Sequence, residues 1–218
     1  MARNSYAVFG MGSFGSKLAL ALMRQGNMVL VCDNNAQRIN ELRDKVTEAV
    51  IGNVSNEDVV KELNVSKFDA VILSMSGYFE DQVLALTLLK QEGAKKVVVK
   101  PNSTIQERIL YRLGADEVIQ PELDVAERLS RRLSLSNITD LFEFRGSAIA
   151  DVVVPAHLGG KPLRELDLRN KYNITILLMR KAGSVDEYAV GPETTLEKGD
   201  QLTVFGEEKA IIELFKER

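Results

Sequence analysis

The sequence predicts a doubly wound α/β fold, a mostly parallel sheet with helices on both faces, followed by a small α+β domain. Three observations predict it. Strand and helix patterns alternate six times within the first 120 residues, a glycine-rich turn follows the first apolar run, and the pattern changes near residue 137. Strands that alternate with helices are joined by right-handed crossovers, which produce a parallel sheet. The length of 218 residues fits one or two domains.

Six short apolar runs in the first half are typical of strands that are buried on both faces. The stretches between them carry apolar residues at helical spacing, and several end at glycine or asparagine, as helices often do. The expected strands cover residues 6–9, 28–32, 48–51, 69–74, 96–100 and 116–119. The expected helices cover residues 14–25, 35–46, 56–63, 79–91 and 103–113, and Ser55 or Asn56 caps the third of them.

The rest of the chain predicts a connecting helix and a second, smaller domain. Residues 122–135 have the apolar spacing of one more helix, and residues 134–137 interrupt it. The expected strands then cover residues 149–154, 174–179, 188–190 and 201–205, with a short helix over 162–169 and a last helix over 207–216. We therefore expect domains over residues 1–121 and 138–218, joined by a connecting segment over 122–137.

Composition excludes several classes of protein. Lys and Arg number 28 against 31 Asp and Glu, and the net charge of −3 argues against a general nucleic-acid binder. Cys32 is the single cysteine and His157 the single histidine, which excludes an internal disulfide, a thiolate cluster and a multi-histidine metal site. We expect Cys32 in the core and His157 in a turn without an obvious partner. No run of eighteen apolar residues or secretory signal is found, so we expect a cytoplasmic protein.

The strongest motif is the turn after the first expected strand, which consists of Gly10, Met11, Gly12, Ser13, Phe14 and Gly15. Asp33 ends the next strand eighteen residues after Gly15, and Asn34 follows it. This spacing matches the dinucleotide-binding fingerprint of the Rossmann fold. The glycines permit a tight turn and bring backbone N–H groups close to a pyrophosphate, while the acid accepts hydrogen bonds from ribose and repels a 2′-phosphate. The alternative is a vestigial turn that binds nothing.

Polar residues follow two other expected strands at the same edge of the sheet, where ligands of doubly wound folds bind. Gly52, Asn53 and Val54 follow the third strand, where they border an adenine or form a simple turn. Ser74 and Met75, with the two residues after them, end the fourth strand. They contact phosphate or ribose, or they serve only as a loop.

Lys100 ends the fifth expected strand, where its charge offsets that of a phosphate or is simply solvated. A dehydrogenase normally needs a proton donor near the nicotinamide. The first domain contains no histidine and no Tyr-x-x-x-Lys set, and the second is short for a substrate domain. A nucleotide site without a visible catalytic set favours sensing, and a small NAD-dependent oxidoreductase is the alternative.

These motifs together resemble the RCK (KTN) family, the cytosolic regulatory subunits of Trk- and Ktr-type potassium uptake systems. The resemblance covers essentially the whole chain. It pairs an N-terminal Rossmann nucleotide-binding domain with a C-terminal α+β ligand-sensing domain. It rests on residues 6–15, 31–33, 52–53, 113–119, 121–122 and 166–172.

The resemblance implies a homo-oligomer, from a dimer to an octameric ring, and no nucleic-acid partner. The ring would lie at the inner face of the cell membrane, beneath a potassium channel or transporter subunit of the Ktr or Trk type. An adenine nucleotide (ATP, ADP or AMP) or NAD(H) would bind the glycine-rich turn and reshape the ring, which opens or closes the pore without any enzymatic turnover.

The resemblance also assigns roles to single residues. The glycines would hold phosphates, Asp33 the ribose and Asn53 the adenine. Glu122 would help to place a cation, Mg²⁺ or Na⁺, beside the nucleotide, and Arg169 would contact cyclic di-AMP in the second domain. Ktr-type members often carry an arginine at the position of Ser13, where it reads the terminal phosphate of ATP. A missing charged hydrogen bond costs roughly 1.5–3 kcal/mol, so ADP, AMP and NAD(H) gain as candidate ligands.

Overall fold

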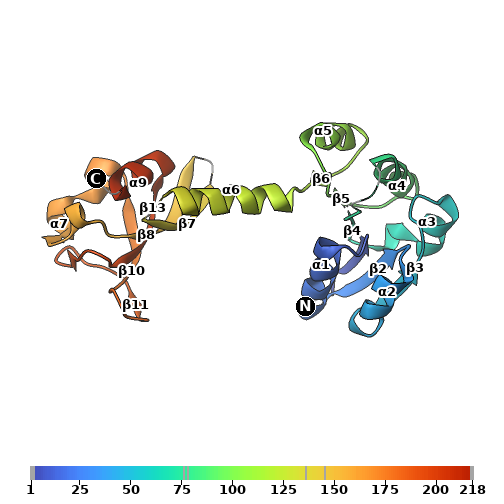
Figure 1. Cartoon of the computed structure of the whole chain (residues 1–218), viewed down its shortest axis with the longest axis horizontal. Helices are drawn as coiled ribbons and strands as arrows, with labels where there is room; N and C mark the ends of the chain where they lie inside the picture. Colours follow the sequence, from blue (N-terminus) through green and yellow to red (C-terminus); the bar gives the residue numbers. More distant parts are fainter. Residues whose placement is uncertain (1–2, 76, 78, 136, 145, 217–218) are drawn as a thin grey trace. The chain divides into compact units, whose positions relative to one another are not determined.

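The computed structural model describes residues 3–75, 77, 79–135, 137–144 and 146–216. Its chain divides into two compact units, residues 1–121 and 122–218, each with its own hydrophobic core (Figure 1). The first unit is built on a parallel sheet and the second on an antiparallel sheet. The predicted fold class is therefore confirmed.

The parallel sheet of the first unit has the strand order β3-β2-β1-β4-β5-β6. The chain moves outward from β1 to β3 and then crosses back, so that β4 lies on the other side of β1. Loops that leave β1 and β4 in opposite directions open a crevice at the carboxyl edge of such a sheet. The strands are β1 (Ser5–Phe9), β2 (Met28–Asp33), β3 (Glu48–Ile51), β4 (Ala70–Leu73), β5 (Val97–Val99) and β6 (Glu117–Val118).

Helices cover both faces of this sheet, because successive strand residues point to opposite sides. Val8 packs in one layer with residues of α1 and α2, and Phe9 packs in the other with residues of α3 and α4. Asn56 is the cap of α3, since its side chain accepts a hydrogen bond from the Asp58 N–H. The helical segments are α1 (Ser13–Arg24), α2 (Ala36–Leu42), η1 (Arg43–Lys45), α3 (Glu57–Leu63), η2 (Val65–Lys67), α4 (Phe79–Gln91) and α5 (Thr104–Arg112).

The second unit folds around a sheet with the order β11-β10-β13-β8-β7. Its last helix buries Ile211, Leu214 and Phe215 in the core that the sheet forms. The main elements are α6 (Pro121–Ser134), β7 (Ile138–Phe144), β8 (Ser147–Val153), β10 (Thr175–Arg180), β11 (Glu187–Tyr188), β13 (Gln201–Glu207) and α9 (Glu208–Phe215). Between them lie η3 (Ala156–Leu158), α7 (Leu163–Leu166), α8 (Leu168–Tyr172) and a small two-stranded sheet of β9 (Lys161–Pro162) and β12 (Thr195–Leu196).

The second unit differs from the sequence prediction at several places, and one of them is the small sheet of β9 and β12, which was not predicted. Strand β7 was not predicted, because a bulge between Ile138 and Asp140 interrupts the alternation of buried and exposed residues. The helix expected over 162–169 is split into α7 and α8 at Asp167, whose φ is +48°. The strand expected over 188–190 is the two-residue edge strand β11. In the described part of the chain, no helix is long and apolar enough to cross a membrane.

Asp200 anchors the turn before β13. Its buried carboxylate accepts hydrogen bonds from the Glu197 N–H (2.8 Å), the Ala182 N–H (3.1 Å) and the Lys181 ammonium (2.9 Å). Burial alone would raise the pKa of Asp200, but these hydrogen bonds and the charge of Lys181 outweigh it and hold that pKa below its ordinary value. The charged form of Asp200 therefore stabilises the second unit.

We expect Asp200→Asn to lower the free energy of unfolding of the second unit by about 2 kcal/mol, because charged hydrogen bonds are lost. A carboxylate with a lowered pKa stabilises the fold fully above its unfolded pKa, about 3.9, and loses this contribution as the pH falls through the folded pKa. Urea unfolding at pH 7 and near pH 3 measures the effect, with exposed Asp186→Asn as the matched control. An effect of Asp200→Asn that is as large near pH 3 as at pH 7 would contradict this assignment.

Candidate functional site

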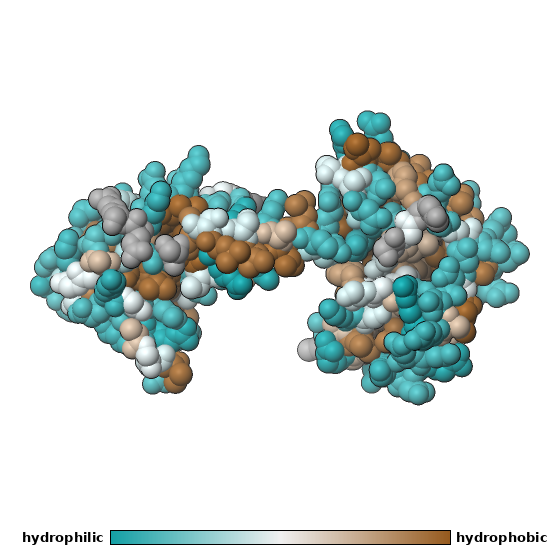
Figure 2. All heavy atoms as spheres, viewed as in Figure 1, coloured by the Kyte–Doolittle hydropathy of each residue, from teal (hydrophilic) through white to brown (hydrophobic). Residues whose placement is uncertain are grey.

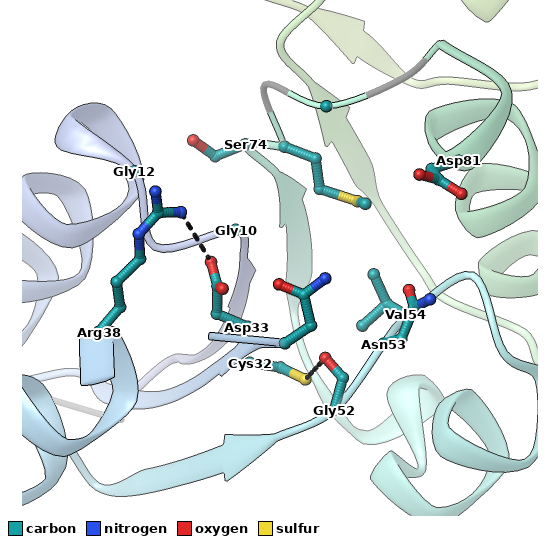
Figure 3. Close-up of a pocket in the computed structure, with 13 residues that line it drawn as sticks. Gly10, Gly12, Cys32, Asp33, Arg38, Gly52, Asn53, Val54, Ser74 and Asp81 are labelled. Atoms are coloured by element: carbon teal, nitrogen blue, oxygen red, sulfur yellow. Dashed lines mark hydrogen bonds and ion pairs between the residues drawn. The ribbon is translucent and has the colours of Figure 1, made fainter. Parts of the chain in front are cut away.

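A cavity of about 300 Å³ opens at the carboxyl edge of the parallel sheet. Figure 3 shows its walls, which come from the loops that follow β1, β2, β3 and β4 and from the first turns of α2 and α4. This is the crevice that the strand order creates beside β1. The residues that line it are Gly10, Gly12, Cys32, Asp33, Asn34, Arg38, Gly52, Asn53, Val54, Ser74, Met75, Gly77 and Asp81.

The glycine-rich turn has room only for glycine at two positions. Gly10 has a φ of +94°, and a Cβ there would lie 2.8 Å from the Met75 nitrogen and from the Ser74 carbonyl carbon. A Cβ on Gly15 would lie 2.1 Å from the Gly10 carbonyl oxygen. Gly12 is the N-cap of α1, and no side chain in the described part of the chain caps that helix. The first N–H groups of α1 are thus left for an acceptor from outside, as at phosphate-binding helix N-termini.

Asp33 joins the turn to the end of β2. The residue is 7% exposed, and its carboxylate accepts hydrogen bonds from the Met11 N–H (2.5 Å) and the Asn35 N–H (2.8 Å). The Arg38 guanidinium lies 3.7 Å from it. A carboxylate has about four lone-pair sites, so these contacts leave acceptor capacity for ribose hydroxyls. Asp33 therefore orients the glycine-rich turn and faces the cavity at the same time.

Ser74 supplies a polar atom that lacks a partner. Its side chain is buried, its residue is 4% exposed, and within the described residues its hydroxyl makes no hydrogen bond. A buried hydroxyl without a partner costs about 1–3 kcal/mol. Asn53 lines the opposite wall, and its side chain also accepts a hydrogen bond from the Ser55 N–H (3.0 Å). Asn53 therefore both stabilises the turn after β3 and lines the cavity.

Two charged residues of the cavity were missed by the sequence analysis. Arg38 lies in the first turn of α2, five residues after Asp33, with a side chain that is 51% exposed. Asp81 lies in the first turn of α4 and accepts a hydrogen bond from the Ser55 hydroxyl (3.1 Å). Both residues come from helices, and the signal that could have found them is their place in the first turn after a cavity-forming loop.

Several predicted residues lie outside the lining. Ser13, Phe14 and Gly15 form the first turn of α1, and Met11 contributes its N–H to Asp33. Lys100 is 8% exposed, so the alternative of a solvated lysine is wrong, and it is absent from the cavity lining among the described residues. Ser76 lies outside the described residues. The predicted role of Lys100, to offset the charge of a phosphate, therefore stays a prediction.

The predicted cation site depends on Glu122, which lies in the first turn of α6 in the second unit. The described residues contain no group of three or more His, Cys, Asp or Glu side chains that could hold a metal ion. The role of Glu122 therefore stays a prediction.

A second cavity, also of about 300 Å³, lies within the second unit. Arg169, at the start of α8, lines it together with Arg164 of α7. The remaining lining residues come from α7, α8 and their junction, from the start of β10 and from the loop around Val190, and they are mostly apolar apart from Asp167 and Thr175. The cavity thus combines two guanidinium groups and one carboxylate with an apolar surface, which suits a ligand that carries both anionic groups and apolar rings.

The two unique side chains have structural surroundings. Cys32 is 1% exposed in the core, as predicted, and burial, with the nearby Asp33 charge, raises the pKa of its thiol to about 12. It is therefore a neutral thiol at physiological pH and not a nucleophile. His157 lies in η3, and its Nε2 is 3.0 Å from the Leu214 carbonyl oxygen. The prediction that His157 has no partner was wrong, because α9 brings a carbonyl to it across the second unit.

Comparison with known proteins agrees with this two-part architecture. The family model of the TrkA-N domain matches residues 6–121, and that of the TrkA-C domain matches residues 148–217. The chain is 31% identical over 212 residues to the Ktr system potassium uptake protein A of Vibrio alginolyticus. This match covers 97% of this chain and 96% of that protein. It is 30% identical over 207 residues to the Ktr system potassium uptake protein C of Bacillus subtilis, with coverage of 94% and 92%.

Solved structures share the fold at lower identity. The GsuK RCK domain superposes with a TM-score of 0.65 at 18% identity, and the GsuK channel bound to NAD with a TM-score of 0.64 at 19% identity. Both matches cover 98% of this chain but only 47% and 39% of those longer chains. Since both domain models match in order and the sequence relatives match almost end to end, the chain belongs to the RCK (KTN) family of Ktr- and Trk-type potassium uptake regulatory subunits.

Proposed function

We propose that this chain is a nucleotide-binding regulatory subunit that gates a membrane potassium channel or transporter of the Ktr or Trk type. The observation that carries the proposal is the cavity beside β1, which the glycine-rich turn, Asp33 and Ser74 line together. Occupancy of the cavity, rather than turnover, is the proposed output.

The proposed ligand is an adenine nucleotide (ATP, ADP or AMP) or NAD(H). The residues present fit a phosphate, a ribose and a base of such a ligand. The N-terminus of α1 suits phosphate, Asp33 suits ribose hydroxyls, and Asn53 with Val54 forms a wall for the base. Solved relatives of the same fold include a GsuK channel bound to ADP and a Kef C-terminal domain in an AMP-bound form. We also propose that Glu122 helps to place Mg²⁺ or Na⁺ beside the phosphates.

Gating requires that the ligand bind two shapes of an oligomer with different affinity. A tenfold preference at one site contributes about 1.4 kcal/mol to the shift between the shapes, and coupled sites multiply the effect. The nucleotide would thus open or close the pore of a membrane partner without any bond being made or broken. The subunit would lie at the cytoplasmic face of the membrane, bound to that partner.

Self-association is supported by α6, a helix without any buried residue. Figure 2 shows hydrophobic side chains along it, and they include Leu123 (46% exposed), Leu129 (42%) and Leu133 (76%). An isolated helix of this length is marginal in water unless its apolar stripe is covered. We propose that further copies of the chain cover it in a homo-oligomer, from a dimer to an octameric ring.

The binding proposal is tested with Asp33→Asn and a calorimetric panel of ATP, ADP, AMP, NAD, NADH and cyclic di-AMP. Asparagine keeps the shape of Asp33 but loses its charge, so ribose loses charged hydrogen bonds. We expect affinity for the panel nucleotides that bind the first domain to fall by about tenfold or more, since such bonds contribute about 1.5–3 kcal/mol. Exposed Asp58→Asn, in the first turn of α3, is the matched control.

Equal affinities of wild type and Asp33→Asn, in variants with matching thermal unfolding midpoints, would refute the assigned role of Asp33. Wild-type protein that binds none of the panel would refute the proposed function. Steady oxidation of NADH by the purified protein would instead support the alternative of a small NAD-dependent oxidoreductase.

The position of Ser13 gives a gain-of-function prediction. Ser13 is exposed at the start of α1, beside the N–H groups proposed to bind phosphate. We expect Ser13→Arg to raise the affinity for ATP relative to ADP by about tenfold or more, because a guanidinium adds a charged hydrogen bond to the terminal phosphate. Calorimetry with both nucleotides measures the ratio, and Ser13→Gln is the uncharged control. An unchanged ratio in Ser13→Arg would contradict this role of the position.

The second cavity supports a second ligand site, for which we propose cyclic di-AMP. The two phosphates and two adenines of cyclic di-AMP match the combination of arginines and apolar side chains around Arg169. We expect Arg169→Ala to weaken cyclic di-AMP binding at least tenfold and to leave nucleotide binding in the first domain unchanged. Lys171→Ala, on the same helix but outside the cavity lining, is the control for calorimetry. Equal loss in both variants would argue against a contact by Arg169.

A further inference from the structure

Gln82 lies in the core of the first unit, on α4, and its side chain connects the ends of two strands. It is fully buried, at 0% exposure. Its Nε2 donates hydrogen bonds to the Met75 carbonyl (2.6 Å) and to the Lys100 carbonyl (3.0 Å). Met75 follows β4 and Lys100 follows β5. This amide therefore connects the segments that leave the two strands, just beyond the point where the pairing of β4 with β5 ends.

The remaining atom of the amide is unmatched. Gln82 Oε1 is buried and has no hydrogen-bond partner among the described residues. The orientation is fixed by the partners, because two carbonyl oxygens require the NH₂ group and both of its hydrogens. A buried acceptor without a donor costs stability. Among the described residues, only half of the hydrogen-bonding capacity of this amide is therefore satisfied, which is typical of positions retained for function rather than for stability.

The carbonyl that Gln82 holds belongs to a wall of the nucleotide cavity. Ser74 and Met75 line that cavity, and their backbone packs against the turn at Gly10, where no Cβ would fit. The Ser74 N–H donates to the Phe9 carbonyl (2.7 Å), which closes the other side of the segment. Movement of Met75 would therefore shift both the Ser74 hydroxyl and the surface on which the glycine-rich turn rests.

We propose that Gln82 is a positioning residue of the nucleotide site, although it lines no part of the cavity. By binding the Met75 and Lys100 carbonyls, it fixes the direction in which the chain leaves β4. This keeps the Ser74 hydroxyl and the glycine-rich turn at the spacing that a nucleotide phosphate and ribose require. The inference rests on the proposed nucleotide binding and adds to it a residue that acts through the backbone of another.

The test compares Gln82→Met, which keeps length and volume but cannot donate, with Val97→Ala. Val97 is buried at 0% exposure at the amino end of β5, away from the cavity edge, and its truncation destabilises the same core. We expect Gln82→Met to weaken binding of ADP and NADH at least tenfold, measured well below the unfolding temperature. Val97→Ala should lower the unfolding temperature and leave both affinities unchanged.

A second measurement needs no ligand. Hydrogen exchange of the Ser74 and Lys100 amides, whose N–H groups donate to Phe9 and Leu73, should accelerate at least tenfold in Gln82→Met. Unchanged exchange would overturn the proposal, and so would accelerated exchange with unchanged affinity. If wild-type protein binds no nucleotide, the proposed function fails, and the exchange rates still decide whether Gln82 holds the segment.

Discussion

The site depends on the close approach of two backbone segments at the carboxyl edge of the sheet. The turn at Gly10 lies so near to Ser74 and Met75 that a Cβ would meet their backbone atoms at 2.8 Å. Gly15 in turn presses against the Gly10 carbonyl, where a Cβ would lie at 2.1 Å. These contacts draw β1, β4 and the start of α1 together and place Gly12, the N-cap of α1, in the cavity lining. Substitution of either glycine would separate the helix from the strand that it must follow.

The sequence predicted the parts of this arrangement that are local. Apolar runs and glycine spacing were enough to place β1, α1 and β2. A parallel strand that is buried on both faces and a fingerprint turn each depend on residues that follow one another in the sequence. The fold class followed from their repetition. The resemblance of the motifs to one family also extended beyond the glycines, and the match of both domain models supports it.

The residues and the strand that the sequence did not predict depend on how distant segments pack together. Arg38 and Asp81 reach the cavity from helices whose orientation is set by packing, and neither has a spacing rule that marks it. Strand β7 was not predicted because its two buried residues, Ile138 and Leu141, are three positions apart in the sequence. A regular strand buries every second residue, and a bulge between Ile138 and Asp140 breaks this alternation. Sequence likewise indicated Asp33 as a ribose acceptor, but the Met11 N–H that it also binds became visible only when two loops were placed together.

The charges around the cavity affect which nucleotide it suits. Its described lining carries two carboxylates, Asp33 and Asp81, against one guanidinium, Arg38, which already faces Asp33 at 3.7 Å. The lining therefore offers a polyphosphate little side-chain charge of the opposite sign. Stabilisation of phosphate must come chiefly from the N–H groups and dipole of α1, whose contribution is typically about 0.3–1 kcal/mol at exposed positions and falls off within the first turn. If the proposed nucleotide binds here, such a site would hold one or two phosphates near the helix better than a third beyond it. Together with serine at position 13, this balance favours the less charged of the proposed ligands, AMP, ADP and NAD(H), over ATP unless a cation accompanies it.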